Sequence, residues 1–398
     1  MQITRIELLN FRNHEHLVLD KVGKVLVIVG DNAAGKTNII EALQLITMHE
    51  SFRRPAAEEL HFREMETEAQ SLISVDITIL DTQNTKQISF KENSRVFFYN
   101  KKERPARELI DLVPAVLFTP DDLQIVKGPP EQRRDLLDNL GSRLSKSFSQ
   151  IRSEYTKALR QKNSLLKQDE VDLGVLDSWN TNLAKLGSSL SKHRRRLFEQ
   201  LIEEAAEVYE KISGGEVLAG TYRALWEEEE EKNGEGKEDQ VSLYELRGAR
   251  EEGESYVVSK EYEELNHASL NEKKEKNNLY EALTRKRDEE LRTKRSLIGP
   301  HRDDVSFTVN GHDARRFASQ GQQRSIALAL KMAEIEILRR VKGAEPLLLL
   351  DDVMSELDAH RRTYFVELIR QSSQTVLTTT NPGYFDEDFL SQATVVKL

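Results

Sequence analysis

A Gly-rich phosphate-binding loop near the start of the chain lies far in sequence from the segments that would complete its site. The loop is residues 30–37, GDNAAGKT, and the other segments are residues 319–324, SQGQQR, and residues 346–352, PLLLLDD. Because all three would serve one nucleotide site, we predict a single ATPase head assembled from both ends of the chain. A large insertion must then lie between them.

The residues around the loop predict the order strand, turn, helix. Residues 25–29 are a short apolar run rich in β-branched residues, and residues 38–46 place apolar side chains as a helix on a sheet does. In this setting the N–H groups of a helix N-terminus bind phosphate oxygens, Lys36 reaches the terminal phosphates and the Thr37 hydroxyl binds Mg²⁺. A bare match to the motif arises by chance in about one chain in a hundred of this length. The flanking strand and helix therefore carry the prediction.

A second buried strand is predicted at residues 347–350, and it ends in Asp351 and Asp352. The carboxyl ends of parallel strands are where ligands bind. We expect Asp351 to hold Mg²⁺ and Asp352 to orient or deprotonate the attacking water. The alternative, two acids that only end a strand, is disfavoured by the P-loop in the same chain.

Residues 319–324 open a helical stretch that continues through residue 333. The Ser319 hydroxyl and the backbone N–H groups beside it then lie at a second helix N-terminus. Such an end favours negative charge, so the sequence predicts a second anion site.

These segments resemble an ATPase superfamily. Ser319, Gly321 and Gln322 before a helix, then the acidic strand and residues 355–358, SELD, are similar to the signature and D-loop of ABC-type heads. In those heads the signature of one subunit covers the γ-phosphate held by another subunit's P-loop. The resemblance implies an α/β, ABC-type P-loop fold and an ATP-dependent homodimer with two composite sites.

Within that superfamily the chain resembles the RecF family of bacterial recombination mediators over nearly its whole length. The segments that carry the resemblance are residues 10–13, 118–123, 127–138, 160–166, 179–187 and 299–304, and GPHRDD at 299–304 is the most diagnostic. Only residues 225–286 match poorly. The resemblance implies ATP and Mg²⁺ as cofactors, DNA as a ligand, and RecR and RecO as partners.

The candidate site residues fall into three groups, and Arg12 and Asn38 enter through the resemblance alone. They are Arg12, Gly30, Asp31, Asn32, Ala33, Ala34, Gly35, Lys36, Thr37, Asn38, Ser319, Gln320, Gly321 and Gln322 for the nucleotide, Thr37 and Asp351 for the metal, and Lys36 and Asp352 for catalysis.

Composition is that of an intracellular protein. The 398 residues include no Cys and no long apolar run, and the first residues carry no export signal, so we expect a cytoplasmic protein without a membrane span. With 38% hydrophobic residues a sizeable core can form, and the length allows about two to three domains.

The net charge of −10 is concentrated in one segment. Residues 227–254 hold twelve acidic and four basic residues, a net of −8, which leaves −2 for the rest of the chain. This low-complexity segment predicts a solvated insertion. Regulation by mimicry of DNA is the less favoured alternative.

The middle of the chain is predicted to be helical. Leucines and other apolar residues recur every seven positions from Leu137 to Leu165 and again from Leu183 to Leu197. Two helices of about 35 residues would form a short antiparallel arm of roughly 50 Å, and an ordinary helical domain is the alternative. We predict a head of residues 1–123 plus 286–398 and an arm of residues 124–285 that includes the acidic segment.

DNA contacts must come from local basic clusters. The candidates are residues 101–107, residues 160–162 and residues 192–196. Such clusters would bind phosphates without reading sequence. For each of them a solvated helix face is an equally good interpretation.

Several positions depart from the generic ABC pattern. Asp352 stands where the general base is usually Glu, and its shorter side chain predicts slow hydrolysis. The strand at residues 375–381 has no switch His, although Thr380 or Asn381 could substitute, and no secure Q-loop is present. His301 lies in the diagnostic motif. We expect it to brace the segment that returns from the arm to the head rather than to act in catalysis.

The predicted function is that of an ATP-dependent DNA-binding clamp with weak, DNA-stimulated ATPase activity. By resemblance it supports recombinational repair of gaps, replication restart and SOS induction. One alternative is a nucleotide-switched scaffold that recruits repair partners without useful turnover. The other is an SMC- or Rad50-like head that regulates a nuclease, which the short arm disfavours.

Overall fold

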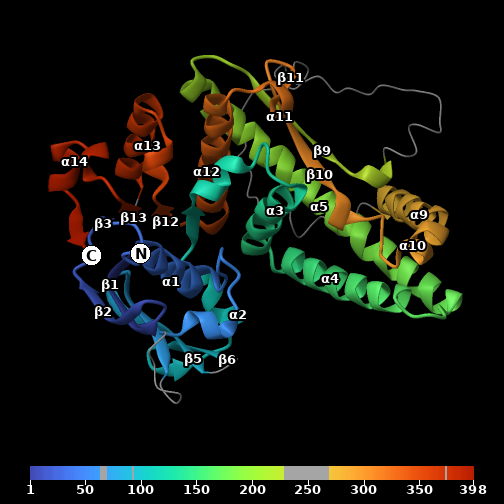
Figure 1. Ribbon diagram of the computed structural model, residues 1–398, viewed down its shortest axis with the longest axis horizontal. Helices are drawn as coiled ribbons and strands as arrows, with labels where there is room; N and C mark the ends of the chain where they lie inside the picture. Colours follow the sequence, from blue (N-terminus) through green and yellow to red (C-terminus); the bar gives the residue numbers. More distant parts are fainter. Residues whose placement is uncertain (63–69, 92–93, 228–268, 373) are drawn as a thin grey trace. The chain divides into compact units, whose positions relative to one another are not determined.

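The computed structural model describes residues 1–62, 70–91, 94–227, 269–372 and 374–398 (Figure 1). All but the first residue of the predicted acidic segment lies outside the described residues. The chain divides into two compact units, and each is described by itself. The first is Met1–Gln124, Glu207–Gly215 and Ser319–Leu398, and the second is Ile125–Ala206 and Glu216–Ala318.

A five-stranded parallel sheet forms the nucleotide-facing part of the first unit. Its order is β14 (Thr394–Lys397), β3 (Val25–Val29), β13 (Gln374–Thr379), β12 (Leu347–Asp351) and β8 (Ala115–Phe118). Every pairing in it is parallel, and Asp351 is opposite Thr378 while Thr379 is opposite Val29. The carboxyl ends of strands from both ends of the chain therefore meet at one edge. The predicted strands at residues 25–29 and 347–350 are confirmed.

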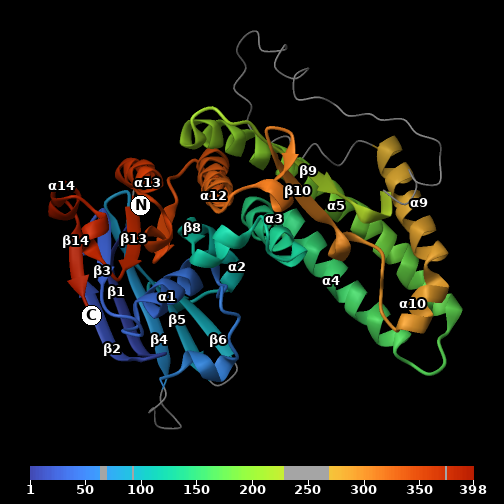
Figure 2. The same cartoon turned by 45° about the horizontal axis from the view of Figure 1, so that its top comes forward.

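The second sheet of this unit is antiparallel and has six strands. Its order is β2 (His14–Asp20), β1 (Gln2–Phe11), β4 (Ser71–Ile79), β5 (Thr82–Lys91), β6 (Ser94–Tyr99) and β7 (Lys102–Glu103). Strands β1, β4, β5 and β6 run side by side in Figure 2. Tight turns of two residues join β4 to β5 and β6 to β7.

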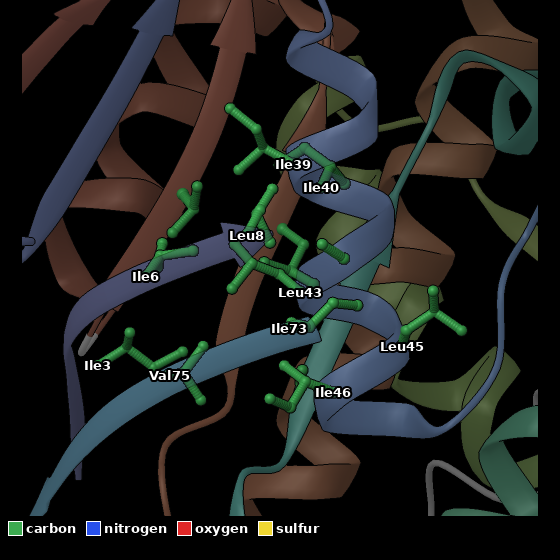
Figure 3. Close-up of a cluster of buried hydrophobic side chains, with 14 of the residues drawn as sticks. Ile3, Ile6, Leu8, Ile39, Ile40, Leu43, Leu45, Ile46, Ile73 and Val75 are labelled. Carbon is green, nitrogen blue, oxygen red and sulfur yellow. The ribbon is translucent and has the colours of Figure 1, made fainter. Parts of the chain in front are cut away.

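Helix α1 (Lys36–Met48) packs into the core that the two sheets share. Its Ile40, Leu43 and Ile46 lie with Leu8 of β1 and Ile73 of β4 in Figure 3, and all five side chains are fully buried. Burial of each such side chain contributes about 1.5–3 kcal/mol. Because apolar residues surround α1, the start of the helix and the loop before it are held firmly.

The remaining helices of the first unit are short except for one. They are α2 (Ala106–Leu109), α12 (Gln320–Lys342), α13 (Ala359–Gln371) and α14 (Glu387–Ser391), with 3₁₀ turns at Ala57–Leu60, Ile110–Leu112, Pro120–Gln124, Val353–Glu356 and Pro382–Tyr384. Helix α12 packs on β8 and on the turn Pro120–Gln124. It thus lies at the opposite edge of the parallel sheet from β14.

The second unit is mostly helical. Its elements are α3 (Pro130–Leu144), α4 (Lys146–Leu166), α5 (Leu173–Ser213, whose end belongs to the first unit), α9 (Ser269–Arg285), α10 (Arg287–Thr293), α11 (Ala314–Phe317), the 3₁₀ turn Pro300–Arg302 and a sheet ordered β11 (His312–Asp313), β10 (Asp304–Val309), β9 (Leu218–Arg223). Apolar residues of α4, α5 and α9 form one core.

The prediction of two helices of about 35 residues was wrong for the first of them. The chain is extended at Ser145, whose hydroxyl accepts a hydrogen bond from the Phe148 N–H and so begins α4 anew. A Cβ at Gly141 would lie 2.7 Å from the Phe148 ring, so the glycine lets α4 pack closely on α3. The second helix, α5, is longer than predicted, with 41 residues.

The division of the chain differs from the expected one near the return to the head. We expected residues 286–398 to join the head, whereas residues 286–318 fall in the second unit. The reason is that β10 pairs with β9 from Asp304 opposite Arg223 to Val309 opposite Leu218. No sequence signal had predicted β9.

Candidate nucleotide-binding site

The loop between β3 and α1 has the backbone shape of a phosphate cradle. Gly35, just before α1, has a φ of 99°, and a Cβ there would lie 2.5 Å from Asn13 Nδ2. Only glycine adopts this conformation without strain. The Lys36 ammonium donates hydrogen bonds of 2.8 Å to the carbonyl oxygens of Gly30 and Asp31, so its side chain arches over the loop.

The N-terminus of α1 supplies the donors of this cradle. The first N–H groups of a helix have no acceptor within it, and the helix dipole adds positive potential there. Asp31, Asn32 and Ala33 are exposed in front of this end, while Lys36 is buried. The arrangement suits a triphosphate, whose negative charge the N–H groups and Lys36 would share.

Thr37 and Asp351 are brought together from the two ends of the chain. The Thr37 hydroxyl donates a 2.9 Å hydrogen bond to Asp351 Oδ1, and the Thr378 hydroxyl donates to the same oxygen at 2.8 Å. Burial raises the pKa of Asp351, and the two hydroxyl contacts oppose the rise. A hydroxyl and a carboxylate are the hard oxygen ligands that Mg²⁺ takes, with phosphate oxygens and water completing its shell. These residues therefore fit a magnesium ion.

Asp352 follows with an unusual backbone and a free carboxylate oxygen. Its φ is 49°, and its N–H donates to the Thr378 hydroxyl at 3.0 Å. Among the described residues its buried Oδ1 has no hydrogen-bond partner. Burial raises the pKa of Asp352, whereas Lys36 and the Thr380 backbone N–H lower it. A carboxylate so placed can accept a proton from water.

The structure pairs Arg12 with an acidic residue of α1. Its guanidinium binds Glu41 of α1 through Nε at 3.0 Å and Nη2 at 2.6 Å, and it donates to the Glu59 carbonyl at 2.7 Å. The Glu41 carboxylate is fully buried, and Arg53 also contacts it at 3.3 Å. In this structure Arg12 braces α1, and its direct contact with nucleotide stays a prediction.

Sequence reasoning missed three residues of this region, which are Asn13, Arg53 and Thr378. Asn38 Nδ2 donates to Asn13 Oδ1 at 2.6 Å, and Arg53 Nη1 donates to Asn38 Oδ1 at 2.6 Å. Thr378 binds Asp351, as described above. Its position in β13 opposite Asp351 could have been found by aligning the two predicted strands. Asn13 lies in the segment 10–13 that carried the resemblance but was given no role, and Arg53 carried no local signal.

Ser319 is the N-cap of α12. Its hydroxyl accepts a hydrogen bond from the Gln322 N–H at 3.2 Å, and the Gln322 side chain accepts one from the Ser319 N–H at 2.8 Å. Ser319 and Gln320 are exposed. A Cβ at Gly321 would lie 3.1 Å from the Arg361 guanidinium, so the glycine keeps this helix end open. The predicted helix N-terminus is confirmed, and its surface can receive an anion.

The helix end is tied to the segment that follows β12. Arg324 forms an ion pair of 3.0 Å with Glu356, and Arg361 Nε donates to the Ser325 hydroxyl at 2.7 Å while its guanidinium also pairs with Asp358. Asp358 in turn accepts the Arg361 N–H as the N-cap of α13. The predicted signature and D-loop are therefore held as one piece.

Two of the three basic clusters predicted to bind DNA are partly buried in ion pairs. Lys162 is fully buried and lies 2.6 Å from Glu290, and Arg194 binds both oxygens of Asp138 at 2.7 and 2.8 Å. These two residues cannot reach a phosphate backbone, so that part of the prediction was wrong. Their positive charge was visible in the sequence, but their partners were not.

The diagnostic motif at residues 299–304 braces the second unit. Asp304 binds Arg133 of α3 through two hydrogen bonds of 2.7 and 2.9 Å, and the Tyr155 hydroxyl is 2.8 Å from His301 Nδ1. Asp303 accepts from Ser191 and Tyr222 at 2.7 and 2.6 Å. Burial lowers the pKa of His301 to about 4. This geometry supports bracing rather than catalysis.

A parallel sheet that carries a P-loop and an acidic strand end, with a Ser-capped signature helix at its edge, defines an ABC-type ATPase head. The model of the RecF/RecN/SMC N-terminal domain matches residues 2–396. DNA replication and repair protein RecF of Synechococcus sp. (strain JA-2-3B'a(2-13)) is 32% identical over 100% of this chain and 96% of its own. RecF of Natranaerobius thermophilus is 34% identical over 98% of this chain and 93% of its own. The chain belongs to the RecF family.

Solved structures agree with this assignment. The recombination mediator RecF with ATPrS superposes with a TM-score of 0.80 at 27% identity, over 100% of this chain and 96% of that chain. The structure of RecF with ATP superposes with a TM-score of 0.76 at 29% identity, over 96% of this chain and 93% of that chain. An Smc head bound to the C-terminal winged-helix domain of ScpA superposes with a TM-score of 0.50 at 14% identity, over 99% of this chain and 93% of that chain. This likeness shows the shared fold alone. Among the described residues no helix combines the length and apolarity needed to span a membrane.

Proposed function

We propose that this chain is an ATP-gated DNA clamp of the RecF type. The observation that carries the proposal is the hydrogen bond of 2.9 Å from Thr37 to Asp351, which places a metal-binding pair beside the Lys36 ammonium. The RecF relatives, named for DNA replication and repair, and the RecF structures with ATP and ATPrS support the ligand classes.

Each residue of the site would have a distinct role. Lys36 and the α1 N–H groups would bind the β- and γ-phosphates, and Thr37 and Asp351 would hold Mg²⁺, which neutralises charge on the phosphates when bound. Asp352 would accept a proton from the attacking water through its free Oδ1. Its short side chain places that oxygen about 1 Å from the position a Glu would reach, so we expect slow hydrolysis.

The exposed cap of α12 would complete the site of a second copy. Ser319 and the N–H groups at this helix end would bind the γ-phosphate held by the other subunit's P-loop. ATP binding would then join two heads on DNA, and hydrolysis would release them. We further propose RecR and RecO as partners, with roles in repair of gaps, replication restart and SOS induction.

Sedimentation with and without ATP tests the dimer. We expect the mass to double with nonhydrolysable ATP in the wild type but not in Lys36→Ala or Ser319→Arg. Lys36→Ala should bind nucleotide about tenfold to a hundredfold more weakly, because a charge-assisted contact to phosphate is lost, whereas Ser319→Arg should bind as the wild type does. Ser153→Arg, at an exposed position on α4, is the matched control. An unchanged mass of the wild type with ATP would overturn the clamp.

A nucleotide-switched scaffold is the second candidate, favoured by the short side chain of Asp352. It would bind ATP and dimerise without useful turnover. Single-turnover hydrolysis with duplex DNA separates the two functions. Release of phosphate at the rate of dimer dissociation supports the clamp, and dissociation without phosphate release supports the scaffold.

A further inference from the structure

The β6–β7 turn and the segment after it carry four exposed cations: Lys101, Lys102, Arg104 and Arg107. Among the described residues no ion pair neutralises any of them. Residues 101–108 hold four basic and two acidic side chains in a chain of net charge −10. We propose that residues 101–107 and the neighbouring turn at Leu80 form the DNA-contacting surface of the first unit. The inference rests on the proposed DNA binding and names its location.

The turn that presents these cations is held rigidly. Asn100 and Lys101 have φ values of 51° and 65°. Asn100 Oδ1 accepts from the Thr85 N–H at 2.9 Å, Asn100 Nδ2 donates to Asn84 Oδ1 at 3.0 Å, and the Asn100 N–H donates to the Thr85 carbonyl at 2.9 Å. Since the backbone is already ordered, binding a phosphate there costs little further backbone entropy, and the remaining cost is that of ordering the Lys and Arg side chains.

The strand after the turn places its basic side chains on one face and its acidic side chain on the other. Lys102 pairs with Tyr99, Glu103 pairs with Phe98, and the Arg104 N–H donates to the Phe97 carbonyl at 2.9 Å. Side chains alternate between the two faces of a strand. Lys102 and Arg104 therefore share one face, and Glu103 lies on the other. The positive side chains can thus meet one phosphate backbone together.

The other basic clusters are weaker candidates. Lys162 and Arg194 are buried in ion pairs, and Arg195 pairs with Glu227 at 2.5 Å. Of the two cations at residues 160–162, Arg160 is exposed and Lys162 is buried. A contact that binds several phosphates needs several free cations near one another, and residues 101–107 provide them.

Leu80 lies at the same end of the antiparallel sheet and is 94% exposed. It forms the β4–β5 turn with Asp81, and their φ values are 45° and 63°. Such turns favour Asn-Gly, so a Leu in this conformation is strained. Thr85, opposite Asn100, is three residues along β5 from its start at Thr82, or about 10 Å. An exposed apolar side chain at this end of the sheet suits apolar contact with bases, and base faces are accessible where a strand is unpaired.

Titration of the full chain with labelled duplex at several salt concentrations, with nonhydrolysable ATP, tests the cations. Lys101→Ala/Lys102→Ala should weaken binding at least about tenfold at low salt and lower the salt slope by about 2, because two phosphate contacts are lost. Lys101→Arg/Lys102→Arg keeps the charge and should bind as the wild type does. Unchanged affinity and slope in the Ala variant would overturn the assignment, and a loss in Arg160→Ala would then place the contact on α4 instead.

Leu80→Asn tests the apolar contact. We expect at least about fivefold weaker binding to a gapped duplex, unchanged binding to a fully paired duplex, and a higher melting temperature because Asn suits the turn. Equal affinity for both DNA forms in wild type and variant would remove Leu80 from the surface. ATP-dependent dimerisation of all variants should match the wild type, which shows that they are folded.

Failure of the surface and failure of the proposed function give different results. If the wild type binds neither duplex nor gapped DNA, the clamp itself is wrong. If the wild type binds DNA and the Lys101 and Lys102 variants bind equally well, only the location is wrong.

Discussion

Thr37 and Asp351 are 314 positions apart in the chain, and a hydrogen bond of 2.9 Å joins their side chains. The contact exists because β3 and β12 both pair with β13 in parallel, so that their carboxyl ends meet at one edge of the sheet. Closing so long a loop costs conformational entropy. The buried strands and α1 offset that cost, and the site is a consequence of their packing.

Replacement of Gly35 should disrupt the phosphate cradle. Gly35→Ala adds a methyl group 2.5 Å from Asn13 Nδ2 at a φ of 99°, and we expect a loss of about 1–2 kcal/mol in unfolding free energy together with weaker ATP binding. Gly343→Ala is the control, because its φ is also positive but the space around it is open. Gly343→Ala should lose stability, measured by urea unfolding, and keep its ATP affinity, measured by nucleotide titration. Equal ATP affinity in Gly35→Ala would contradict the role of the loop.

Removal of the Asp352 charge should separate hydrolysis from binding. In Asp352→Asn we expect ATP affinity and dimerisation to persist while single-turnover hydrolysis falls at least about a hundredfold, since a general base contributes about that much. Burial raises the pKa of Asp352, so wild-type hydrolysis should decline as the pH falls through a value above the usual one for Asp. The variant should lack this limb. A variant that hydrolyses ATP at the wild-type rate would rule out Asp352 as the base.

The ion pair of Arg194 with Asp138 should be needed for stability rather than for DNA binding. Arg194→Ala leaves the buried Asp138 carboxylate with the partly exposed Arg152, 3.1 Å away, as its ion-pair partner, and we expect a loss of about 3 kcal/mol. Arg160→Ala, on an exposed surface of α4, should change stability by no more than about 0.5 kcal/mol. Urea unfolding followed by circular dichroism gives both values. A stable Arg194→Ala protein with weakened DNA binding would reverse our assignment.

His301 should make the stability depend on pH. Its folded pKa is about 4, below about 6.5 in an unfolded chain, so the unfolded state binds more protons between these values and stability falls as the pH falls through them. Between pH 7 and pH 5 this group should cost the wild type about 2 kcal/mol. His301→Gln keeps a polar partner for Tyr155. Its unfolding free energy should fall by about 2 kcal/mol less than that of the wild type between pH 7 and pH 5. Parallel pH dependence of the two proteins would show that His301 does not titrate as described.

Much of the nucleotide site could be predicted from local sequence. The strand before the loop, the helix after it, the acidic end of β12 and the Ser319 cap are each defined by residues within a few positions of one another. Apolar periodicity and capping act over one or two turns of chain, so they are readable without tertiary contacts. The residues of the P-loop, Asp351, Asp352 and the start of α12 were all placed in their elements in this way.

The tertiary structure decided which polar residues are free. Arg12 is bound by Glu41, Lys162 by Glu290 and Arg194 by Asp138, and each partner lies more than twenty positions away. Pairing of β9 with β10 was equally invisible. By itself the sequence determined an ATPase head completed by both chain ends. Which charges brace the fold and which remain available to a ligand was set by long-range burial, because a charge taken out of water must find its partner wherever the fold brings one.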